Sequence, residues 1–244
     1  MLSIVIPSYR GGAILAKNLP GFIAFLKKES IEHEIIIVDD GSADHGETRD
    51  LALALGCRFC QHAKNKGKGA AIRTGMLAAQ GEYRLFIDAD IPFVYDAILR
   101  FLYYLDFKEF DIVIGDRTLP ESVYFEKITP LRKVFSKVFS FFVARFVTGG
   151  FFDTQCGLKA FRGKVAQDIF SVTRIQRFSA DIEILYVALK RNYDIKRLPV
   201  KLRFNEGSSV RLITDSLIMV MDLFRIRWNY TLGRYRSIDH GPVK

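Results

Sequence analysis

Two aspartates separated by one residue, Asp88 and Asp90, follow the segment 84–87, which is apolar apart from Arg84. Carboxylates two positions apart, just past a strand, can both turn toward one divalent cation, and such hard oxygen ligands suit Mg²⁺ or Mn²⁺. A cation held there would neutralise a diphosphate and stabilise it as a leaving group. The alternative is a solvated turn with two capping aspartates, and this short pattern alone leaves both open.

A second pair of carboxylates, Asp39 and Asp40, is followed by Gly41 and Ser42. The glycine permits a tight turn, and carboxylates at a strand end can accept hydrogen bonds from ribose hydroxyls or from a base N–H. Asp40 or Ser42 could instead cap the helix that begins near Ala43. Both roles can hold at once, so the pair is a candidate nucleotide contact.

A segment rich in glycine and lysine, residues 65–73, leads into a helix. It lacks the third glycine of a dinucleotide-binding loop and is not a Walker A loop. Backbone N–H groups at a helix N-terminus still attract anions, and Lys68 and Arg73 add positive charge. The alternative is a solvated run of charges.

These motifs lie among apolar runs and helical patterns that alternate along the front half of the chain. The alternation predicts an α/β fold with a largely parallel central sheet and helices on both faces. Ligands bind beyond the carboxyl ends of such strands, so the strand ends at Asp39, Asp88 and Asp116 should share one edge. The predicted strands are 3–6, 34–38, 58–61, 83–88 and 111–115. The predicted helices are 13–28, 46–55, 70–79, 93–105 and 179–191, and the segment 195–204 is predicted to be extended.

The back half of the chain also contains two patterns of amphipathic helices. Residues 131–148 carry phenylalanines at helical spacing among Lys and Arg, which is typical of a helix in a bilayer interface. A second helix, over 209–227, carries apolar side chains such as Met221 and Phe224 and ends beside Trp228. Both helices could instead pack on the sheet or form a dimer.

The 244-residue chain has a net charge of +9, with −3 in residues 1–130 and +12 in residues 131–244. A basic back half suits phosphate or an anionic membrane surface. No nucleic-acid-binding module is recognisable and the aromatic residues follow helical stripes, which argues against a nucleic-acid partner. The pattern of a signal peptide and a membrane-spanning stretch are both missing. The three cysteines, Cys57, Cys60 and Cys156, are expected to be reduced and structural.

Four segments together resemble the motifs of glycosyltransferase family 2, and the resemblance covers about residues 1–210. They are Ile4–Tyr9, Val38–Ser42, Asn65–Gly75 and Asp88–Asp90. Two more, Asp153–Phe161 and Phe178–Leu185, resemble the branch that includes dolichyl-phosphate β-glucosyltransferase and dolichyl-phosphate mannose synthase. The resemblance implies a GT-A fold, a nucleotide-sugar donor, Mg²⁺ or Mn²⁺, and inversion at the anomeric carbon.

The resemblance also implies roles for individual residues. Arg117 would contact a donor or acceptor phosphate, and Asp153 would lie near the reacting centre. Pro92, which cannot ligate a metal through its side chain, stands where mannose synthases often carry Gln. The candidate catalytic residues are Asp90, Asp153, Arg117 and Lys159; the candidate nucleotide-sugar ligands are Pro7, Tyr9, Asp39, Asp40, Lys68, Arg73, Asp88 and Gln155; the candidate metal ligands are Asp88 and Asp90.

The expected activity is transfer of one hexose from a nucleotide diphosphate sugar, UDP-glucose in preference to GDP-mannose, to a polyprenyl or dolichyl phosphate. A soluble sugar or protein acceptor, or a nucleotidyltransferase on the same fold, are the alternatives. The Gln-x-x-Arg-Trp motif of processive synthases is missing, which favours a single transfer. We expect a catalytic domain over 1–210, a C-terminal helix with a basic tail over 211–244, and a peripheral position on the cytoplasmic face of a membrane.

Overall fold

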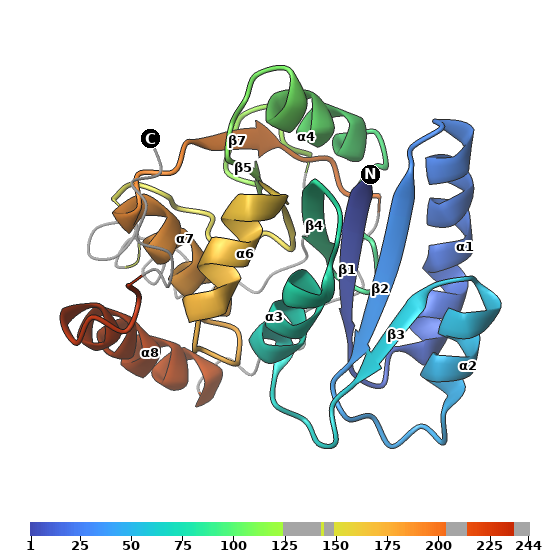
Figure 1. Cartoon of the computed structure of the whole chain (residues 1–244), viewed down its shortest axis with the longest axis horizontal. Helices are drawn as coiled ribbons and strands as arrows, with labels where there is room; N and C mark the ends of the chain where they lie inside the picture. Colours follow the sequence, from blue (N-terminus) through green and yellow to red (C-terminus); the bar gives the residue numbers. More distant parts are fainter. Residues whose placement is uncertain (124–142, 144–148, 204–213, 237–244) are drawn as a thin grey trace.

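The computed structural model describes residues 1–123, 143, 149–203 and 214–236. These residues build one seven-stranded sheet in the order β3-β2-β1-β4-β6-β5-β7, in which only β6 is antiparallel to its neighbours (Figure 1). The predicted α/β architecture with a largely parallel sheet is therefore confirmed. The strands are β1 (Leu2–Ser8), β2 (His33–Asp39), β3 (Arg58–Gln61), β4 (Tyr83–Ile87), β5 (Ile112–Asp116), β6 (Leu158–Arg162) and β7 (Ile195–Pro199).

Helices cover both faces of the sheet and make three layers (Figure 1). One face packs against α1 (Gly12–Lys28), α2 (Glu47–Ala54) and α4 (Ala97–Asp106). The other packs against α3 (Lys68–Ala78), α6 (Gly163–Val172) and α7 (Ala180–Lys190). The last helix, α8 (Thr214–Thr231), lies against α7 at the side of the molecule.

The strand sequences explain this layering. In β1, Ile4 and Ile6 point into the core under α1, whereas Val5 points into the core under α3. All three side chains are fully buried. Strands covered on both faces need apolar residues at every position, which is why the central runs are continuously hydrophobic and do not alternate with polar residues.

The predicted strands and the front-half helices are confirmed, with shifts of up to four residues at their ends. Two elements were not predicted, β6 and α6. In β6, Lys159 interrupts the apolar run that would have indicated a buried strand. The second amphipathic helix is present as α8, although it ends four residues later than expected. The helix expected over 131–148 lies outside the described residues apart from Val143, which is helical and fully buried.

The direction of the strands decides where the site forms. Strands β1, β2, β4 and β5 run the same way, so their last residues, Ser8, Asp39, Ile87 and Asp116, share one edge. Because β6 runs the opposite way, its start at Leu158 lies at that edge. The segment that precedes β6 is thereby inserted between the ends of β4 and β5. Within the described part of the chain, no helix is long and apolar enough to cross a bilayer.

Candidate active site

The turn after β4 carries Asp88 and Asp90. The Ile91 N–H donates to the Asp88 carbonyl at 2.9 Å, and this closes the turn. Ile91 has a φ of 45° and a fully buried side chain. A β-branched residue rarely adopts this left-handed conformation, and such strain is typical of functional sites. The buried Ile91 side chain therefore anchors the turn that carries the two aspartates at the sheet edge.

Asp88 is enclosed from two sides. The Lys68 ammonium lies 2.6 Å from its Oδ1. On the other side lies Gly157, where a Cβ would be 2.0 Å from Asp88 Oδ2. Any side chain at this position would have to displace the Asp88 carboxylate. The glycine of the motif before β6 is thus explained by the space that the Asp88 carboxylate takes.

Lys68 is the first residue of α3, and its charge is stabilised by the acidic groups around it. Burial opposes the charged ammonium, but the carboxylates of Asp88, Asp181 and Asp90 outweigh this effect and raise the pKa of Lys68 above its usual value. Lys68 is therefore a cation throughout the physiological range, next to the predicted diphosphate site.

A second ion pair lies on the β5 side of the same segment. The Arg117 guanidinium donates to both oxygens of Asp153 at 2.8 Å, and the Arg117 backbone N–H donates at 2.7 Å. Burial disfavours the Asp153 carboxylate, but Arg117 outweighs that effect and lowers the pKa of Asp153. A fork held by two N–H bonds is rigidly oriented. Asp153 therefore positions Arg117, whose side chain remains about one-third exposed.

Lys159, in β6, lies deeper than expected for a residue that contacts substrate. Its side chain is fully buried, and its ammonium lies 2.5 Å from Asp181 in α7 and 2.7 Å from the Cys156 carbonyl. Lys159 has no exposed surface. The structure thus places it behind the site, where it supports the turn before β6 and compensates the charge of Asp181.

Asp39 and Asp40 are also turned inward. Asp39 accepts hydrogen bonds from the backbone and hydroxyl of Ser42 and from Gln61. Asp40 Oδ1 lies 2.7 Å from His62 Nδ1, and its carboxylate accepts two backbone N–H groups of the loop before α3. Both side chains are buried. They shape the loops around the site, and their contact with nucleobase and ribose stays a prediction.

The contacts expected at the end of β1 lie at the same edge of the sheet as the Asp88 turn. Pro7 is buried inside the strand, whereas Tyr9 is about half exposed and lies below the Arg10 guanidinium at 5.3 Å. The buried Ser8 Oγ has no hydrogen-bond partner among the described residues. An exposed aromatic ring beside an unsatisfied hydroxyl is consistent with a surface that a ligand completes.

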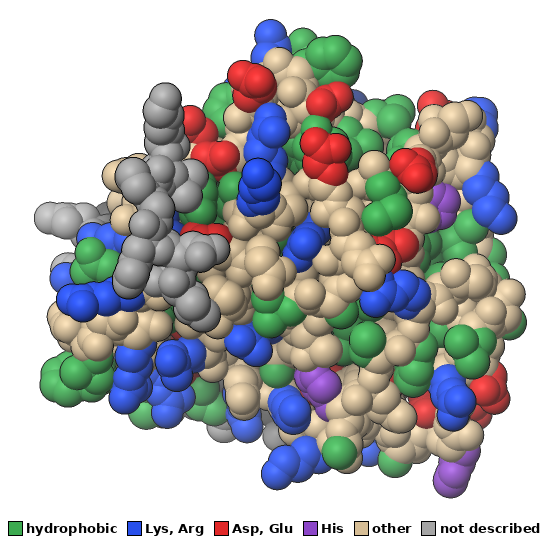
Figure 2. All heavy atoms as spheres, viewed as in Figure 1, with side chains coloured by type: hydrophobic (Ala, Val, Ile, Leu, Met, Phe, Trp, Pro, Cys, Tyr) green, Lys and Arg blue, Asp and Glu red, His purple; other side chains and the backbone are tan. Residues whose placement is uncertain are grey.

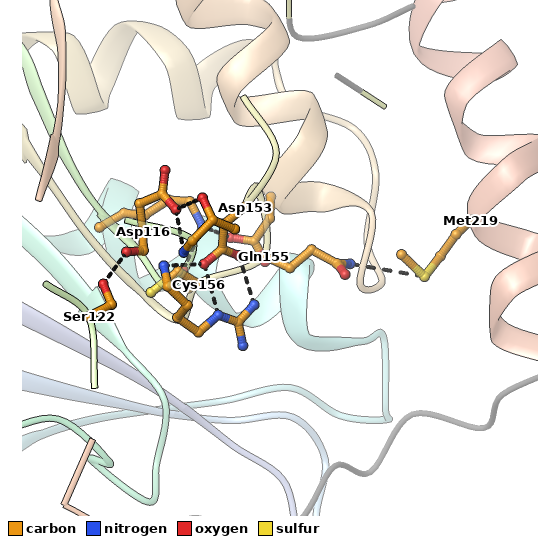
Figure 3. A network of polar contacts seen from close by, with 10 residues as sticks. Asp116, Ser122, Asp153, Gln155, Cys156 and Met219 are labelled. Carbon is orange, nitrogen blue, oxygen red and sulfur yellow. Dashed lines mark hydrogen bonds and ion pairs between the residues drawn. The ribbon is translucent and has the colours of Figure 1, made fainter. Parts of the chain in front are cut away.

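Two predicted ligands are directed elsewhere. The Arg73 guanidinium donates to the Ser171 carbonyl at 3.2 Å and so joins α3 to α6. The Gln155 amide reaches Met219 of α8, at 4.0 Å from its sulfur (Figure 3). The structure does not bring these two side chains to the Asp88 turn.

The residues present fit a divalent cation only in part. Among residues 1–123, 143, 149–203 and 214–236, no three side chains of His, Cys, Asp or Glu are grouped closely enough to hold a metal ion. Asp88 and Asp90 supply carboxylates from one turn, which suits Mg²⁺ or Mn²⁺ when phosphate oxygens and water complete the coordination. The site is thus suited to a cation that arrives with a diphosphate.

Sequence reasoning missed the roles of two residues. The sequence places Gly157 in a motif but indicates no physical role for it. The sequence places Asp181 in a predicted helix but indicates no partner for its charge. Both act through contacts between distant segments, with Asp88 and with Lys159. The signal that could have identified Asp181 is a charged side chain within an apolar helix, since buried charges need partners.

Known proteins resemble this chain in sequence. The model of the family described as Glycosyl transferase family 2 matches residues 3–170. The dolichyl-phosphate β-glucosyltransferase of Dictyostelium discoideum is 33% identical over 251 residues, which cover 96% of this chain and 76% of that protein. The enzyme of the same name from Saccharomyces cerevisiae is 33% identical over 259 residues, 97% of this chain and 77% of that protein.

Solved structures resemble the fold. The glucosyl-3-phosphoglycerate synthase of Mycobacterium tuberculosis, in complex with Mn²⁺, UDP and phosphoglyceric acid, has a TM-score of 0.68 at 18% identity, over 99% of this chain and 80% of that chain. The mannosyl-3-phosphoglycerate synthase of Rubrobacter xylanophilus has a TM-score of 0.69 at 18% identity, and the match covers 96% of this chain and 75% of that chain. Together with the sequence matches, this fold and the strand-end carboxylates show that the chain belongs to glycosyltransferase family 2.

Proposed function

We propose that this protein transfers one glucosyl residue from UDP-glucose to the phosphate of a dolichyl or other polyprenyl phosphate, with Mg²⁺ or Mn²⁺ bound. The names of its relatives support the sugar and the acceptor class. The observation that carries the proposal is a pair of oriented cations at one edge of the sheet: Asp88 holds Lys68 just past β4, and Asp153 holds Arg117 just past β5. A reaction between a diphosphate and a phosphate needs positive charge for both.

The proposed transfer needs little proton chemistry. An acceptor phosphate oxygen attacks the anomeric carbon from one face, and the bond to the diphosphate breaks on the other, so that the electron pair leaves with UDP. A phosphate is already ionised at neutral pH and needs no general base. Catalysis then depends on positioning and charge neutralisation. Lys68 would bind the donor diphosphate, and Arg117, oriented by Asp153, would bind the acceptor phosphate.

The metal site belongs to the same proposal. Asp88 and Asp90 would hold the cation, which would supply neutralisation of the departing diphosphate. Asp90 belongs to the same turn as Asp88, and the buried side chain of Ile91 anchors that turn. Pro92 continues the turn and donates no ligand, which is consistent with a site whose coordination the donor completes.

The outer face of α8 supports a lipid acceptor. Met221, Phe224 and Trp228 recur at helical spacing and are 61%, 73% and 65% exposed. The opposite face of the helix, with Ile226 and Asn229, is buried against the protein. Figure 2 shows Lys and Arg side chains gathered over α8, beside hydrophobic ones. An exposed apolar stripe beside basic residues is typical of a helix that lies in an anionic bilayer surface.

The enzymatic proposal is tested with the purified protein, Mn²⁺ and polyprenyl phosphate in mixed micelles. Radiolabelled UDP-glucose should yield a labelled lipid, whereas GDP-mannose should yield little. Asp90→Ala and an excess of chelator should each abolish the product. Transfer that persists at the same rate with chelator would exclude the metal, and transfer only to water-soluble acceptors would exclude the lipid.

The membrane part has its own test, flotation with vesicles that contain anionic lipid. The double variant Phe224→Glu/Trp228→Glu should lose most of its vesicle binding. Phe107→Glu is the matched control, because Phe107 is 75% exposed at the end of α4, away from α8. Equal flotation of both variants and the wild type would contradict the assignment of this face.

A further inference from the structure

The Lys68 ammonium forms an ion pair with one oxygen of Asp88, the first of the two carboxylates in the predicted metal site. Lys68 Nζ and Asp88 Oδ1 are 2.6 Å apart, and the two side chains are only 24% and 33% exposed. A divalent cation bound to Asp88 would need that same carboxylate. An ammonium and a metal ion cannot both approach it closely without repelling each other.

Lys68 has little freedom to move its backbone away. The preceding N–H, of Gly67, donates to the buried Asp40 at 2.7 Å. The N–H of Ala70 donates to the Gln176 carbonyl at 3.0 Å. Gly69, which follows Lys68, packs so closely against Ala180 that a Cβ on it would lie 2.3 Å from the Ala180 Cβ. The start of α3 is therefore fixed, and only the Lys68 side chain can change its partner.

Asp88 is equally constrained. Its N–H donates to the Gly157 carbonyl at 3.3 Å, and its carboxylate fills the space beside that glycine. The turn that follows is held by the buried Ile91. Since neither backbone can withdraw, a metal ion and Lys68 must compete for this carboxylate.

We infer that Lys68 is an internal counterion that competes with the divalent cation for Asp88, and that a nucleoside diphosphate relieves the competition by accepting the Lys68 ammonium. The inference rests on the proposed function and deepens it. It explains how the Asp88 carboxylate is neutralised without a metal. It also makes the affinities for metal and nucleotide depend on each other through Lys68, because a coupling between two ligands is reciprocal.

Loss of the ammonium through deprotonation does not resolve the competition. A lysine side chain is ordinarily protonated at neutral pH, and the Lys68 ammonium lies 2.6 Å from the Asp88 carboxylate, so the group stays charged. The ammonium therefore has to be moved to another anion, and the donor diphosphate is the anion that the proposed reaction brings.

The test is a calorimetric titration of Mn²⁺ into the full chain, with and without UDP. Lys68→Gln should bind Mn²⁺ alone about tenfold more tightly than the wild type, because a single and a double charge about 5 Å apart repel by that factor even in water. The same variant should gain about tenfold less Mn²⁺ affinity from UDP. Lys68→Arg, which keeps the charge, should resemble the wild type.

Lys66→Gln is the matched control, because it removes the same charge from an exposed side chain two residues earlier. It should change the affinity for Mn²⁺ alone by less than about threefold, since exposed charges are screened. Unchanged or weaker Mn²⁺ binding by Lys68→Gln, an equal gain in Lys66→Gln, or no Mn²⁺ binding by any variant would overturn the inference. The Mn²⁺ titration needs no sugar transfer, so a failure of the proposed function would appear separately, as no labelled lipid with intact Mn²⁺ binding.

Discussion

Replacing Gly157 by alanine tests the geometry of the site most directly. The added Cβ would lie 2.0 Å from Asp88 Oδ2 and 2.5 Å from its Cγ. An ordinary carbon–oxygen contact is about 3.3 Å, so the carboxylate has to move by more than about 1 Å. Gly157 does not have a positive φ, and alanine is compatible with its backbone. The side chain of Asp88 should therefore move while the fold persists.

The expected loss follows from that displacement. A misplacement of about 1 Å at a reacting centre costs on the order of 10²-fold in rate. This corresponds to about 2.7 kcal/mol of transition-state free energy. We expect Gly157→Ala to lower kcat/KM for UDP-glucose by about that factor, measured by transfer of label to polyprenyl phosphate, with a melting temperature close to that of the wild type.

A double-mutant cycle shows whether Asp88 transmits the effect. In an Asp88→Ala background the added methyl has no carboxylate to displace, so Gly157→Ala should cause almost no further loss. Gly21→Ala is the control, since its Cβ would lie 3.4 Å from the Tyr95 hydroxyl, outside the site. The reasoning is refuted if Gly157→Ala keeps activity within about threefold, or if it costs as much without the carboxylate as with it.

Three further predictions concern buried charges and hydrogen bonds. Lys159→Met should lower the free energy of unfolding, measured in urea, by about 3–5 kcal/mol because it leaves Asp181 buried and unpaired. The double variant Lys159→Met/Asp181→Leu should recover most of that lost stability. Equal losses of stability in the single and the double variant would contradict the pairing. Tyr235→Phe should cost about 1–3 kcal/mol in thermal unfolding, because its hydroxyl lies 2.5 Å from the fully buried Glu183 carboxylate, and an unshifted melting curve would refute this. Asp153→Asn should destabilise the protein at pH 7. Because the folded pKa of Asp153 lies below its ordinary value of 3.8, its ionised form stabilises the fold above that value, and the difference from wild type should shrink as the pH falls below it; a difference independent of pH would argue against the ion pair.

Much of this architecture follows from local patterns. Residues 4–7 of β1, 35–38 of β2 and 85–87 of β4 form continuously apolar runs, which indicate strands covered on both faces, and turn residues follow each strand. The positions of Asp39 and Asp88 just past these strands could therefore be assigned to one edge of a parallel sheet. Both the strands and the strand-end positions are present in the structure.

The sequence did not reveal which way the side chains at that edge face. Asp40 follows a strand like Asp88, yet it is turned inward to bind His62 and the loop before α3. Arg73 follows Lys68 on the same helix, but only Lys68 reaches the aspartate turn. Spacing along one segment indicates where a residue lies, whereas its partner depends on other segments of the chain.

The chain by itself determined an α/β sheet, the strand ends that carry carboxylates, and the family to which it belongs. The tertiary structure alone decided that antiparallel β6 inserts between β4 and β5, which brings Gly157 against Asp88 and buries Lys159 beside Asp181. The physical reason is the separation of the interacting residues along the chain. Hydrophobic periodicity and turn chemistry act over a few residues, so the sequence reveals them. The contacts of Gly157 with Asp88 and of Lys159 with Asp181 join groups that are 22 or more positions apart, and they form only when the sheet is assembled.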